Sequence, residues 1–409
     1  MISRFVAVML WSLAAVSLTA CADMAPVSPL PPDPAAALKL PPGFVVNVFA
    51  RLSPARGDYF RGPRFMAFGP DGNLYLSLGL DHKVVMLPDA NHDGRADAVV
   101  TVADKLNGPQ GLVFADGRLY VANQDGVVRL EQKNGKWPAA GAMAIIADLP
   151  AGGHTLKTLR LGPDGYFYLN VGSSCNVCME ADPLRATILR YSVDGRPAGA
   201  LTTLGRHASS PIWAAGLRNS EGFAWHPQTG AMYATNNGAD IRSDSKGGTP
   251  VDELPPEHLN RIEAGQNYGW PHCWGDHATD PNFPGAEGFC ARAQPPALTF
   301  SAHAAPLGIT FLDKSAFPSD YRNDALVALH GSWNRRQPSG YKVVRVHFDH
   351  GQPVSSSDFI TGWLMPGGAW GRPVDVTSGP DGALYVSDDR AGLVYRIIYS
   401  AQQENGVEK

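Results

Sequence analysis

The turn Gly162-Pro163-Asp164-Gly165 lies between two apolar runs, residues 159–161 (Leu-Arg-Leu) and residues 166–171 (Tyr-Phe-Tyr-Leu-Asn-Val). An Asp-Gly pair between such runs is typical of a tight β-hairpin, because glycine accepts the positive φ that the turn requires. His154 stands shortly before this hairpin, in the glycine loop Gly152-Gly153-His154. The stretch therefore predicts a hairpin with a lone histidine at its rim. This histidine is a candidate catalytic residue only if other loops of the fold lie close to it.

The same hairpin unit occurs six times, the fifth copy being degenerate. The copies lie at residues 65–75, 111–120, 159–169, 223–233, 308–329 and 376–385. Their spacing leaves room for four strands each, so the pattern predicts an all-β fold, a six-bladed β-propeller with four-stranded blades. Two packed sandwiches are the alternative, but they would not repeat one hairpin six times. We expect residues 44–49 to close the ring by pairing with residues 392–398 of the last blade.

The composition agrees with a protein of many short strands. Among 409 residues there are 44 Gly and 34 Pro, and only 18% of the residues are charged. A hydrophobic content of 44% is normal for a globular protein. The net charge of −4 leaves no basic footprint, so nucleic acid is not an expected partner.

The first residues are typical of a targeting segment. Arg4 precedes an apolar run over residues 5–15, and Leu18-Thr19-Ala20-Cys21 resembles a bacterial lipobox. We therefore expect a signal peptide of lipoprotein type over residues 1–20, with cleavage as an ordinary secretory peptide as the alternative. The expected location is the periplasmic face of a bacterial membrane, in the first instance the outer one, held only by a lipid on Cys21. Residues 21–38, rich in Pro and Ala, are expected to form an extended tether, residues 39–400 the propeller and residues 401–409 a polar tail.

Four cysteines remain after Cys21, and an even number in an exported chain favours two disulfides. Pairing within each local set, Cys175 with Cys178 and Cys273 with Cys290, is the simplest of three connectivities. A redox or metal-binding role for the Cys-x-x-Cys is the alternative. Met179, not histidine, follows Cys178, so the pair is no haem attachment site.

Three loops join the His154 loop as candidates for chemistry, because long insertions in such folds carry function. One loop holds Arg218-Asn219 and leads into the fourth hairpin; a second holds Arg372 and leads into the sixth. The third covers residues 246–254, where Gly/Pro-rich backbone carbonyls and carboxylates are oxygen ligands that suit Ca²⁺. Residues 89–97 also resemble the start of an EF-type calcium loop without its distal Glu, and a polar hairpin tip is the equal alternative.

The chain resembles soluble pyrroloquinoline quinone-dependent sugar dehydrogenases of the glucose/sorbosone dehydrogenase type. The resemblance covers roughly residues 40–400 and is most specific at residues 216–225 (Gly-Leu-Arg-Asn-Ser-Glu-Gly-Phe-Ala-Trp), 252–254 (Asp-Glu-Leu) and 267–271 (Asn-Tyr-Gly-Trp-Pro). That family has a six-bladed propeller with the quinone on one face, which agrees with the fold expected from the repeats.

The resemblance implies a set of cofactor residues. His154 matches the family's catalytic base, and Arg218 with Asn219 matches the pair that contacts the quinone. Arg372 matches one of two cations that grip the quinone carboxylates, whereas the second position holds Val374. The remaining matches are Gln110, a glutamine beside the cofactor, and Arg335 or Arg336, which would replace a family lysine.

The resemblance also implies two calcium sites. Backbone carbonyls of Gly247 and Gly248 would hold an ion beside the cofactor. Glu253 and Tyr268, with Asp276 as a third candidate, would hold a structural ion.

The expected activity is oxidation of a sugar or related alcohol or aldehyde hydrate. His154 would take the hydroxyl proton, and Arg218 with Ca²⁺ would polarise the quinone. A cytochrome or the quinone pool would accept the electrons. A calcium-dependent propeller lactonase or esterase and a non-catalytic binding propeller are the rival interpretations, since one fold hosts many functions.

Overall fold

The computed structural model describes residues 27–52, 62–132, 134–137, 141–201 and 209–400. The expected signal peptide, Cys21 and the expected polar tail lie outside these residues. Within them, no helix is long and apolar enough to cross a membrane.

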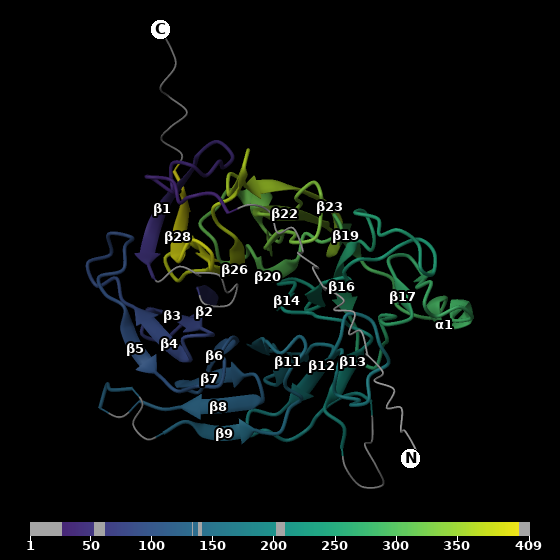
Figure 1. The fold of residues 1–409 in the computed structure, drawn as a ribbon. Helices are drawn as coiled ribbons and strands as arrows, with labels where there is room; N and C mark the ends of the chain where they lie inside the picture. Colours follow the sequence, from purple (N-terminus) through teal and green to yellow (C-terminus); the bar gives the residue numbers. More distant parts are fainter. Residues whose placement is uncertain (1–26, 53–61, 133, 138–140, 202–208, 401–409) are drawn as a thin grey trace, which may run out of the picture.

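Six four-stranded antiparallel sheets stand around a central axis like the blades of a propeller (Figure 1). The architecture predicted from the repeats is confirmed. From the axis outward, blade 1 is β2 (Pro63–Phe68), β3 (Leu74–Leu78), β4 (Lys83–Leu87) and β5 (Val100–Ala103); blade 2 is β6 (Leu112–Ala115), β7 (Arg118–Asn123), β8 (Gly126–Leu130) and β9 (Met143–Ile146); blade 3 is β10 (Leu159–Leu161), β11 (Phe167–Val171), β12 (Thr187–Tyr191) and β13 (Ile212–Ala215). Blade 4 is β14 (Phe223–Trp225), β15 (Met232–Asn236), β16 (Glu257–Ile262) and β19 (Leu298–Phe300); blade 5 is β20 (Pro306–Phe311), β21 (Ala325–Leu329), β22 (Lys342–Asp349) and β23 (Gln352–Ile360); blade 6 is β26 (Pro373–Ser378), β27 (Leu384–Asp388), β28 (Leu393–Tyr399) and β1 (Phe44–Arg51).

The ring is closed as expected, by β1 from the beginning of the propeller pairing with β28 from its end. Phe44 lies opposite Tyr399 and Arg51 opposite Leu393 in this antiparallel pair. The Phe44 ring also packs edge to face on Phe317 and Phe359 of blade 5, at 4.8 and 5.0 Å between ring centres. Strand pairing and apolar packing together hold the first and last segments of the ring.

The Gly-Pro-Asp-Gly turns owe their sequence to a contact that repeats from blade to blade. In blade 3, the Asp164 carboxylate accepts a hydrogen bond from the Tyr168 hydroxyl at 2.9 Å, and Gly165 has φ +77°. A Cβ on Gly162 would lie 2.6 Å from the Tyr168 ring, so only glycine fits there. The same Asp-to-Tyr bond occurs between Asp71 and Tyr75 and between Asp381 and Tyr385.

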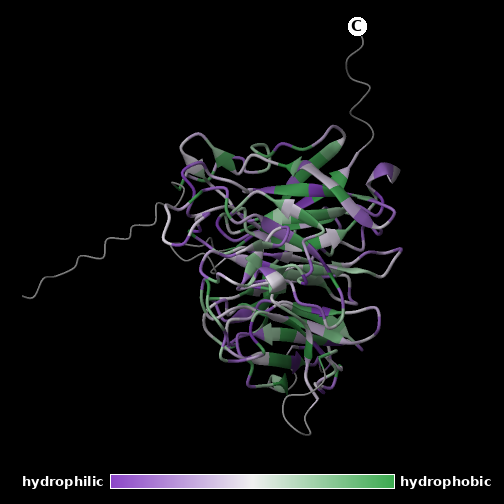
Figure 2. Cartoon of the chain, turned by 90° about the vertical axis from the view of Figure 1, so that its right-hand side faces the viewer, coloured by the Kyte–Doolittle hydropathy of each residue, from purple (hydrophilic) through white to green (hydrophobic). Residues whose placement is uncertain are grey.

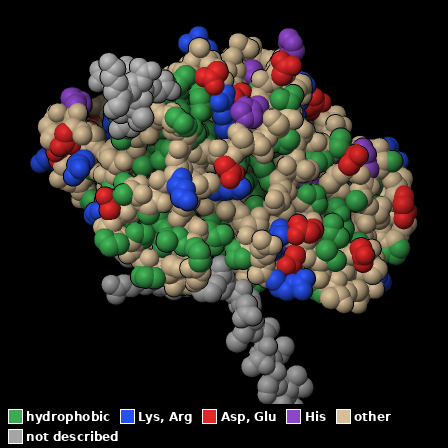
Figure 3. All heavy atoms as spheres, turned by 90° about the horizontal axis from the view of Figure 1, so that it is seen from above, with side chains coloured by type: hydrophobic (Ala, Val, Ile, Leu, Met, Phe, Trp, Pro, Cys, Tyr) green, Lys and Arg blue, Asp and Glu red, His purple; other side chains and the backbone are tan. Residues whose placement is uncertain are grey.

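The hydrophobic core lies between neighbouring blades. Residues with almost no exposure line the blade-to-blade contacts, and Figure 2 shows hydrophobic residues along the stacked strands and many hydrophilic ones in the connecting turns. On the face seen in Figure 3, acidic and basic side chains are interspersed. Each blade therefore presents its strand ends and loops at the two ends of the axis, where a site can be assembled from several blades.

Two small extra sheets, one short helix and one 3₁₀ turn complete the fold. They are β17 (Cys273–Trp274) with β18 (Ala278–Thr279), β24 (Leu364–Met365) with β25 (Gly368–Ala369), α1 (Glu287–Cys290) and η1 (Ser319–Tyr321). Both expected disulfides are confirmed: Cys175 is joined to Cys178, and Cys273 is joined to Cys290 at the end of α1.

The described part of the expected tether lies against the propeller instead of extending away from it. Val27 pairs with Ala369, and Lys39, just beyond the tether, exchanges backbone hydrogen bonds with Thr361. Leu38 is only 7% exposed within the core of blades 5 and 6. These contacts correct the expectation for residues 27–38, because burial and backbone pairing fix a segment that composition alone described as free.

Candidate active site

His154 lies in the loop before β10, and Ser173, two residues after the end of β11, fixes its ring. The His154 backbone N–H donates to the Ser173 carbonyl at 2.9 Å, and Nδ1 lies 3.1 Å from the same carbonyl and 2.9 Å from Ser173 Oγ. Ser173 Oγ in turn donates to the Cys175 carbonyl at 2.7 Å. A carbonyl only accepts, and the hydroxyl proton is already used, so Nδ1 carries the ring proton and Nε2 keeps its lone pair.

The environment of His154 keeps the ring neutral. Burial, followed by the positive charge of Arg218, lowers the pKa of His154 to about 4, although the Ser173 hydrogen bond acts in the opposite direction. A neutral imidazole with a free Nε2 is the form that a general base requires at neutral pH.

Two cations that sequence reasoning missed hold the His154 loop through its carbonyl groups. Lys157 Nζ donates to the carbonyls of Pro150 at 2.9 Å and Thr155 at 3.1 Å. Arg185 Nη1 donates to the Gly152 carbonyl at 3.0 Å. Because these contacts involve backbone oxygens, which every residue has, no sequence motif predicts them.

Arg218 lies beside the histidine and is almost fully buried. Its Nη2 lies 3.0 Å from Asp240 Oδ2 and 2.9 Å from Asn176 Oδ1, and its Nε donates to the Asn176 carbonyl at 3.0 Å. The backbone N–H of Ser173 donates to the Arg218 carbonyl at 2.8 Å. Ser173 therefore contacts both the histidine and the arginine that the sequence singled out.

Asn219 is brought against His154 by a glycine. A Cβ on Gly172 would lie 2.4 Å from His154 Cβ and 2.9 Å from Asn219 Oδ1, so only glycine fits between them. Asn219 Nδ2 donates to Glu221 Oε1 at 2.9 Å. Asn219 Oδ1 is buried and has no hydrogen-bond partner among the described residues. An amide oxygen left in this state is suited to a ligand that donates to it or to a cation.

A buried polar network crosses the axis of the ring. Arg64 of β2 contacts Asp389 at 2.9 Å, Glu221 at 3.1 Å and Gln110 at 3.1 Å. Asp389 also binds His330 Nε2 at 3.0 Å. The predicted residue Gln110 thus belongs to a network of five blades that also holds Asn219, through Glu221.

Arg372 reaches the same network from blade 6. Its Nε donates to the His330 carbonyl at 3.0 Å and its Nη2 to the Gly331 carbonyl, and its guanidinium lies 5.5 Å from the Tyr341 ring centre. Val374, where the family has a second cation, is fully buried in a small apolar cluster with Phe65 and Leu307. The apolar packing of Val374 leaves Arg372 as the cation of this strand.

The two arginines proposed to replace the family lysine have different surroundings. The Arg335 side chain is 8% exposed, pairs with Glu253 Oε1 at 2.5 Å and donates to the Ala302 carbonyl at 3.0 Å. The Arg336 side chain is 91% exposed and lies 3.5 Å from Asp252. Of these two arginines, Arg335 is the one whose side chain is buried and fixed by an ion pair and a hydrogen bond.

The residues expected to bind a structural calcium ion have separate partners. Glu253 pairs with Arg335, and the Tyr268 hydroxyl donates to the Arg261 carbonyl at 2.6 Å. The Asp276 side chain is 91% exposed and lies beside His277. The structure therefore does not gather Glu253, Tyr268 and Asp276 into a site.

The other calcium candidates are loops. Gly247 is exposed in a turn, and the Gly248 N–H donates to the Ser245 carbonyl at 3.0 Å. In the loop over residues 89–97, the Asp89 carboxylate accepts the backbone N–H groups of Asp93 and Gly94. These bonds describe a closed polar turn, which agrees with a hairpin tip.

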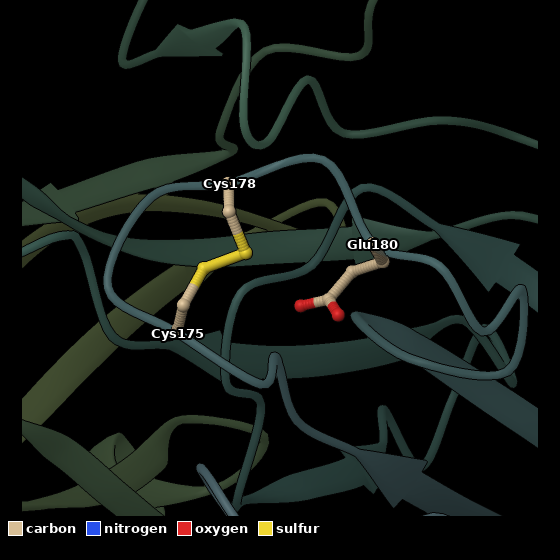
Figure 4. Close-up of side chains that lie close together, drawn as sticks. All are labelled: Cys175, Cys178 and Glu180. Carbon is tan, nitrogen blue, oxygen red and sulfur yellow. A yellow bond between two sulfur atoms is a disulfide. The ribbon is translucent and has the colours of Figure 1, made fainter.

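One group of potential metal ligands stands out among the described residues: Cys175, Cys178 and Glu180, whose ligand atoms lie within 4.8 Å of one another (Figure 4). The two sulfurs are joined in a disulfide, and the Glu180 carboxylate accepts hydrogen bonds from the backbone N–H and the hydroxyl of Ser174. Because a cysteine must be a thiolate to bind a metal, the two disulfide-bonded cysteines do not form a metal site.

Three further residues of the site escaped sequence reasoning: Asn176, Asp240 and Glu257. Glu257 is fully buried near Arg218 and Asp240, and burial raises its pKa to about 8. In the sequence, Glu257 could have been noticed as an acidic residue inside the strand pattern Pro-Pro-Glu-His-Leu-Asn at residues 255–260. Asp240 could have been noticed because it follows the polar pair Asn236-Asn237 at the end of β15. Asn176 was hidden between the two cysteines.

Fold and site together define a six-bladed propeller with a histidine, two buried arginines and a buried polar network at its axis. The chain belongs to the TrAA12-like family, whose model matches residues 57–400.

Among related sequences are two sugar dehydrogenases. The pyrroloquinoline quinone-dependent pyranose dehydrogenase of Coprinopsis cinerea is 26% identical over 86% of this chain and 54% of that protein. The aldose sugar dehydrogenase YliI of Escherichia coli (strain K12) is 26% identical over 61% of each protein. This chain therefore spans about half to three fifths of the length of these two relatives.

Solved structures show the same fold. The calcium structure of a Trichoderma reesei carbohydrate-active enzyme of family AA12 has a TM-score of 0.75 at 21% identity, over 91% of this chain and 100% of that one. The holo form of the quinone domain of the Coprinopsis cinerea pyranose dehydrogenase has a TM-score of 0.73 at 23% identity, over 88% and 97%.

Proposed function

We propose that the protein is a quinoprotein dehydrogenase. It oxidises a sugar or sugar-derived alcohol or aldehyde, aldose-like or sorbosone-like, with pyrroloquinoline quinone as acceptor. The observation that carries the proposal is the neutral His154, which lies beside Arg218 and Asn219 and whose Nε2 keeps its lone pair. The dehydrogenases among its relatives support the same class of reaction.

The residues present fit an anionic quinone. Arg218 and Arg372 are buried and positively charged, and positive charge in a site favours an anionic ligand. The buried Asn219 oxygen offers one further polar contact. When bound, the quinone supplies the acceptor for the hydride that leaves the substrate carbon.

The chain's own groups perform the proton chemistry and the positioning. His154 Nε2 accepts the proton of the substrate hydroxyl, and the imidazolium so formed keeps its Nδ1–H on Ser173. Arg218, held by Asp240 and Asn176, keeps a fixed positive charge beside the reacting groups, where it stabilises developing negative charge. Lys157 and Arg185 hold the His154 loop while the proton moves.

Calcium belongs to the proposal as a second cofactor, and the oxygen groups beside Arg218 suit it. Asp240 accepts from Asn334 Nδ2 at 2.9 Å, and Asn237 lies three residues before Asp240. The side-chain amide oxygens of Asn237 and Asn334 are buried without a hydrogen-bond partner within the described part of the chain. Carboxylate and amide oxygens of this kind, together with the carbonyls of Gly247 and Gly248, are the ligands we propose.

The test is reconstitution. Apoprotein mixed with pyrroloquinoline quinone and Ca²⁺ should develop the absorbance of a bound quinone and reduce a dye when an aldose or sorbosone is added. His154→Ala should bind the quinone and lose dye reduction, because the base alone is removed. A His154→Ala protein with full activity would refute the role of His154, and lactone hydrolysis without quinone would favour a lactonase.

The place of action is a separate proposal. We propose export and a lipid on Cys21, with a cytochrome or the quinone pool as electron acceptor. Mass spectrometry of the membrane-extracted protein should show a diacylglyceryl group on Cys21 that Cys21→Ser removes. An unmodified Cys21 in the extracted protein would exclude the anchor.

A further inference from the structure

The segment over residues 173–178 contacts both the base and the arginine of the proposed site. Ser173 binds His154 Nδ1, as described above. Asn176, three residues later, makes four hydrogen bonds to two residues of the site. Its carbonyl and its Oδ1 accept from Arg218 at 3.0 and 2.9 Å, its Oδ1 accepts the Asp240 N–H at 2.7 Å, and its Nδ2 donates to the Asp240 carbonyl at 2.8 Å.

Asn176 lies in a loop that contains no helix or strand, and Asn176 is exposed to solvent. Such a loop holds one geometry only where covalent or polar links restrict it. The Cys175–Cys178 disulfide encloses Asn176 in a small ring. The Glu180 carboxylate, which accepts hydrogen bonds from Ser174, lies beside this disulfide (Figure 4). The covalent ring thus limits the positions that the Asn176 amide and carbonyl can take.

Arg218 depends on this loop for its orientation. Its one ion pair among the described residues is with Asp240, and Asp240 is itself bonded to Asn176. Asn176→Ala would therefore remove the Oδ1 hydrogen bond of the guanidinium and both ties between the loop and Asp240, and would keep only the bond from Arg218 Nε to the backbone carbonyl. The Arg218 side chain would then be held mainly by its ion pair with Asp240 and by the 3.4 Å hydrogen bond from Nη1 to the Asn237 carbonyl, without the side-chain contact from the loop.

We propose that Asn176 is a positioning residue for Arg218, and that the Cys175–Cys178 disulfide is the covalent link that keeps Asn176 in place. The inference rests on the proposed function, since Arg218 acts on the quinone there. It assigns the disulfide to cofactor binding, whereas the Cys273–Cys290 disulfide stabilises the insertion that carries α1.

The experiment compares quinone affinity with stability. Three variants are made: Asn176→Ala, Cys175→Ser with Cys178→Ser, and the matched control Cys273→Ser with Cys290→Ser. For each apoprotein the thermal midpoint is measured, and the dissociation constant of pyrroloquinoline quinone is obtained by absorbance titration with Ca²⁺ present.

Asn176→Ala is expected to weaken quinone binding by about 10- to 100-fold, the usual effect of removing a group that orients a ligand-binding residue. Its thermal midpoint should change little, because Asn176 is exposed. The Cys175/Cys178 variant should weaken binding in the same direction. The control should lower the thermal midpoint with much less effect on the dissociation constant, because Cys273 lines the same small cavity as Arg218 but its disulfide with Cys290 does not enclose Asn176.

Equal quinone affinity in Asn176→Ala and unmodified protein would overturn this inference alone. Absence of quinone binding by the unmodified protein would overturn the proposed function and this inference together. If a cysteine variant fails to fold, mild reduction of the unmodified protein should reach the partly exposed Cys175–Cys178 pair before the buried Cys290. Affinity that stays constant after that pair is reduced, as counted by thiol alkylation, would exclude a role for the disulfide.

Discussion

Gly172→Ala is expected to disable the site by moving His154. An added Cβ would lie 2.4 Å from His154 Cβ and 2.7 Å from the His154 carbonyl oxygen. Two carbon atoms in contact need about 3.5–4.0 Å, so one of the two groups must move by about 1 Å. A displacement of about 1 Å in a catalytic group costs about 100-fold in rate, and overpacking of a core costs about 1–3 kcal/mol in free energy of unfolding.

The assay is dye-linked turnover of the reconstituted protein, measured with the thermal midpoint of the apoprotein. Gly172→Ala should lower kcat about 100-fold. Gly199→Ala is the matched control, because its Cβ would lie 2.4 Å from the Ile212 carbonyl oxygen at the edge of blade 3, away from His154. The control should lose stability and keep its kcat. A folded Gly172→Ala protein with unchanged kcat would refute the reasoning that Gly172 sets the position of the base.

Three further predictions concern charge and metal. In the apoprotein, NMR titration of His154 should give a pKa of about 4, and Arg218→Met should raise it, because the Arg218 charge is its second largest cause after burial; a pKa near 6.5 in both proteins would contradict this. The pKa of Glu257 is raised to about 8 by burial, so the native state keeps a proton that the unfolded state has released, and stability is lost as pH rises from about 4.5 to about 8. Glu257→Gln should therefore lose less free energy of unfolding than the unmodified protein between pH 5 and pH 8 in urea titrations, and equal losses would argue against a buried, protonated Glu257. Removal of Ca²⁺ by a chelator should weaken quinone binding, Asp240→Asn should mimic this effect, and quinone affinity that ignores both changes would exclude calcium from the site.

The propeller could be predicted because its cause is local and repeated. The sequence of each Gly-Pro-Asp-Gly turn has a local physical cause. In blade 3, Asp164 accepts a hydrogen bond from the Tyr168 hydroxyl, and the Tyr168 ring leaves no room for a side chain at Gly162. Three such turns and three variants of the same hairpin imply six blades. The two disulfides also followed from local spacing.

The site could be predicted only as a set of separate loops. His154, Arg218 and Asn219 stood out by residue type, but nothing in their order along the chain shows that Gly172 lies between the histidine and the asparagine. The calcium set of Glu253, Tyr268 and Asp276 looked as plausible in sequence, yet each of these side chains has a different partner. Spacing along a chain does not report distance across blades.

The chain's own order of residues was sufficient for the blade count and the turn chemistry, because each depends on neighbours within one hairpin. The protonation of His154, the orientation of Arg218 and the network around Arg64 depend on contacts between blades and on burial, which arise only when the ring closes. Burial removes water from these charges, and it is this loss of solvent that sets the pKa of His154. The tertiary structure alone therefore decided that the lone histidine of a glycine loop is neutral and lies beside a buried cation.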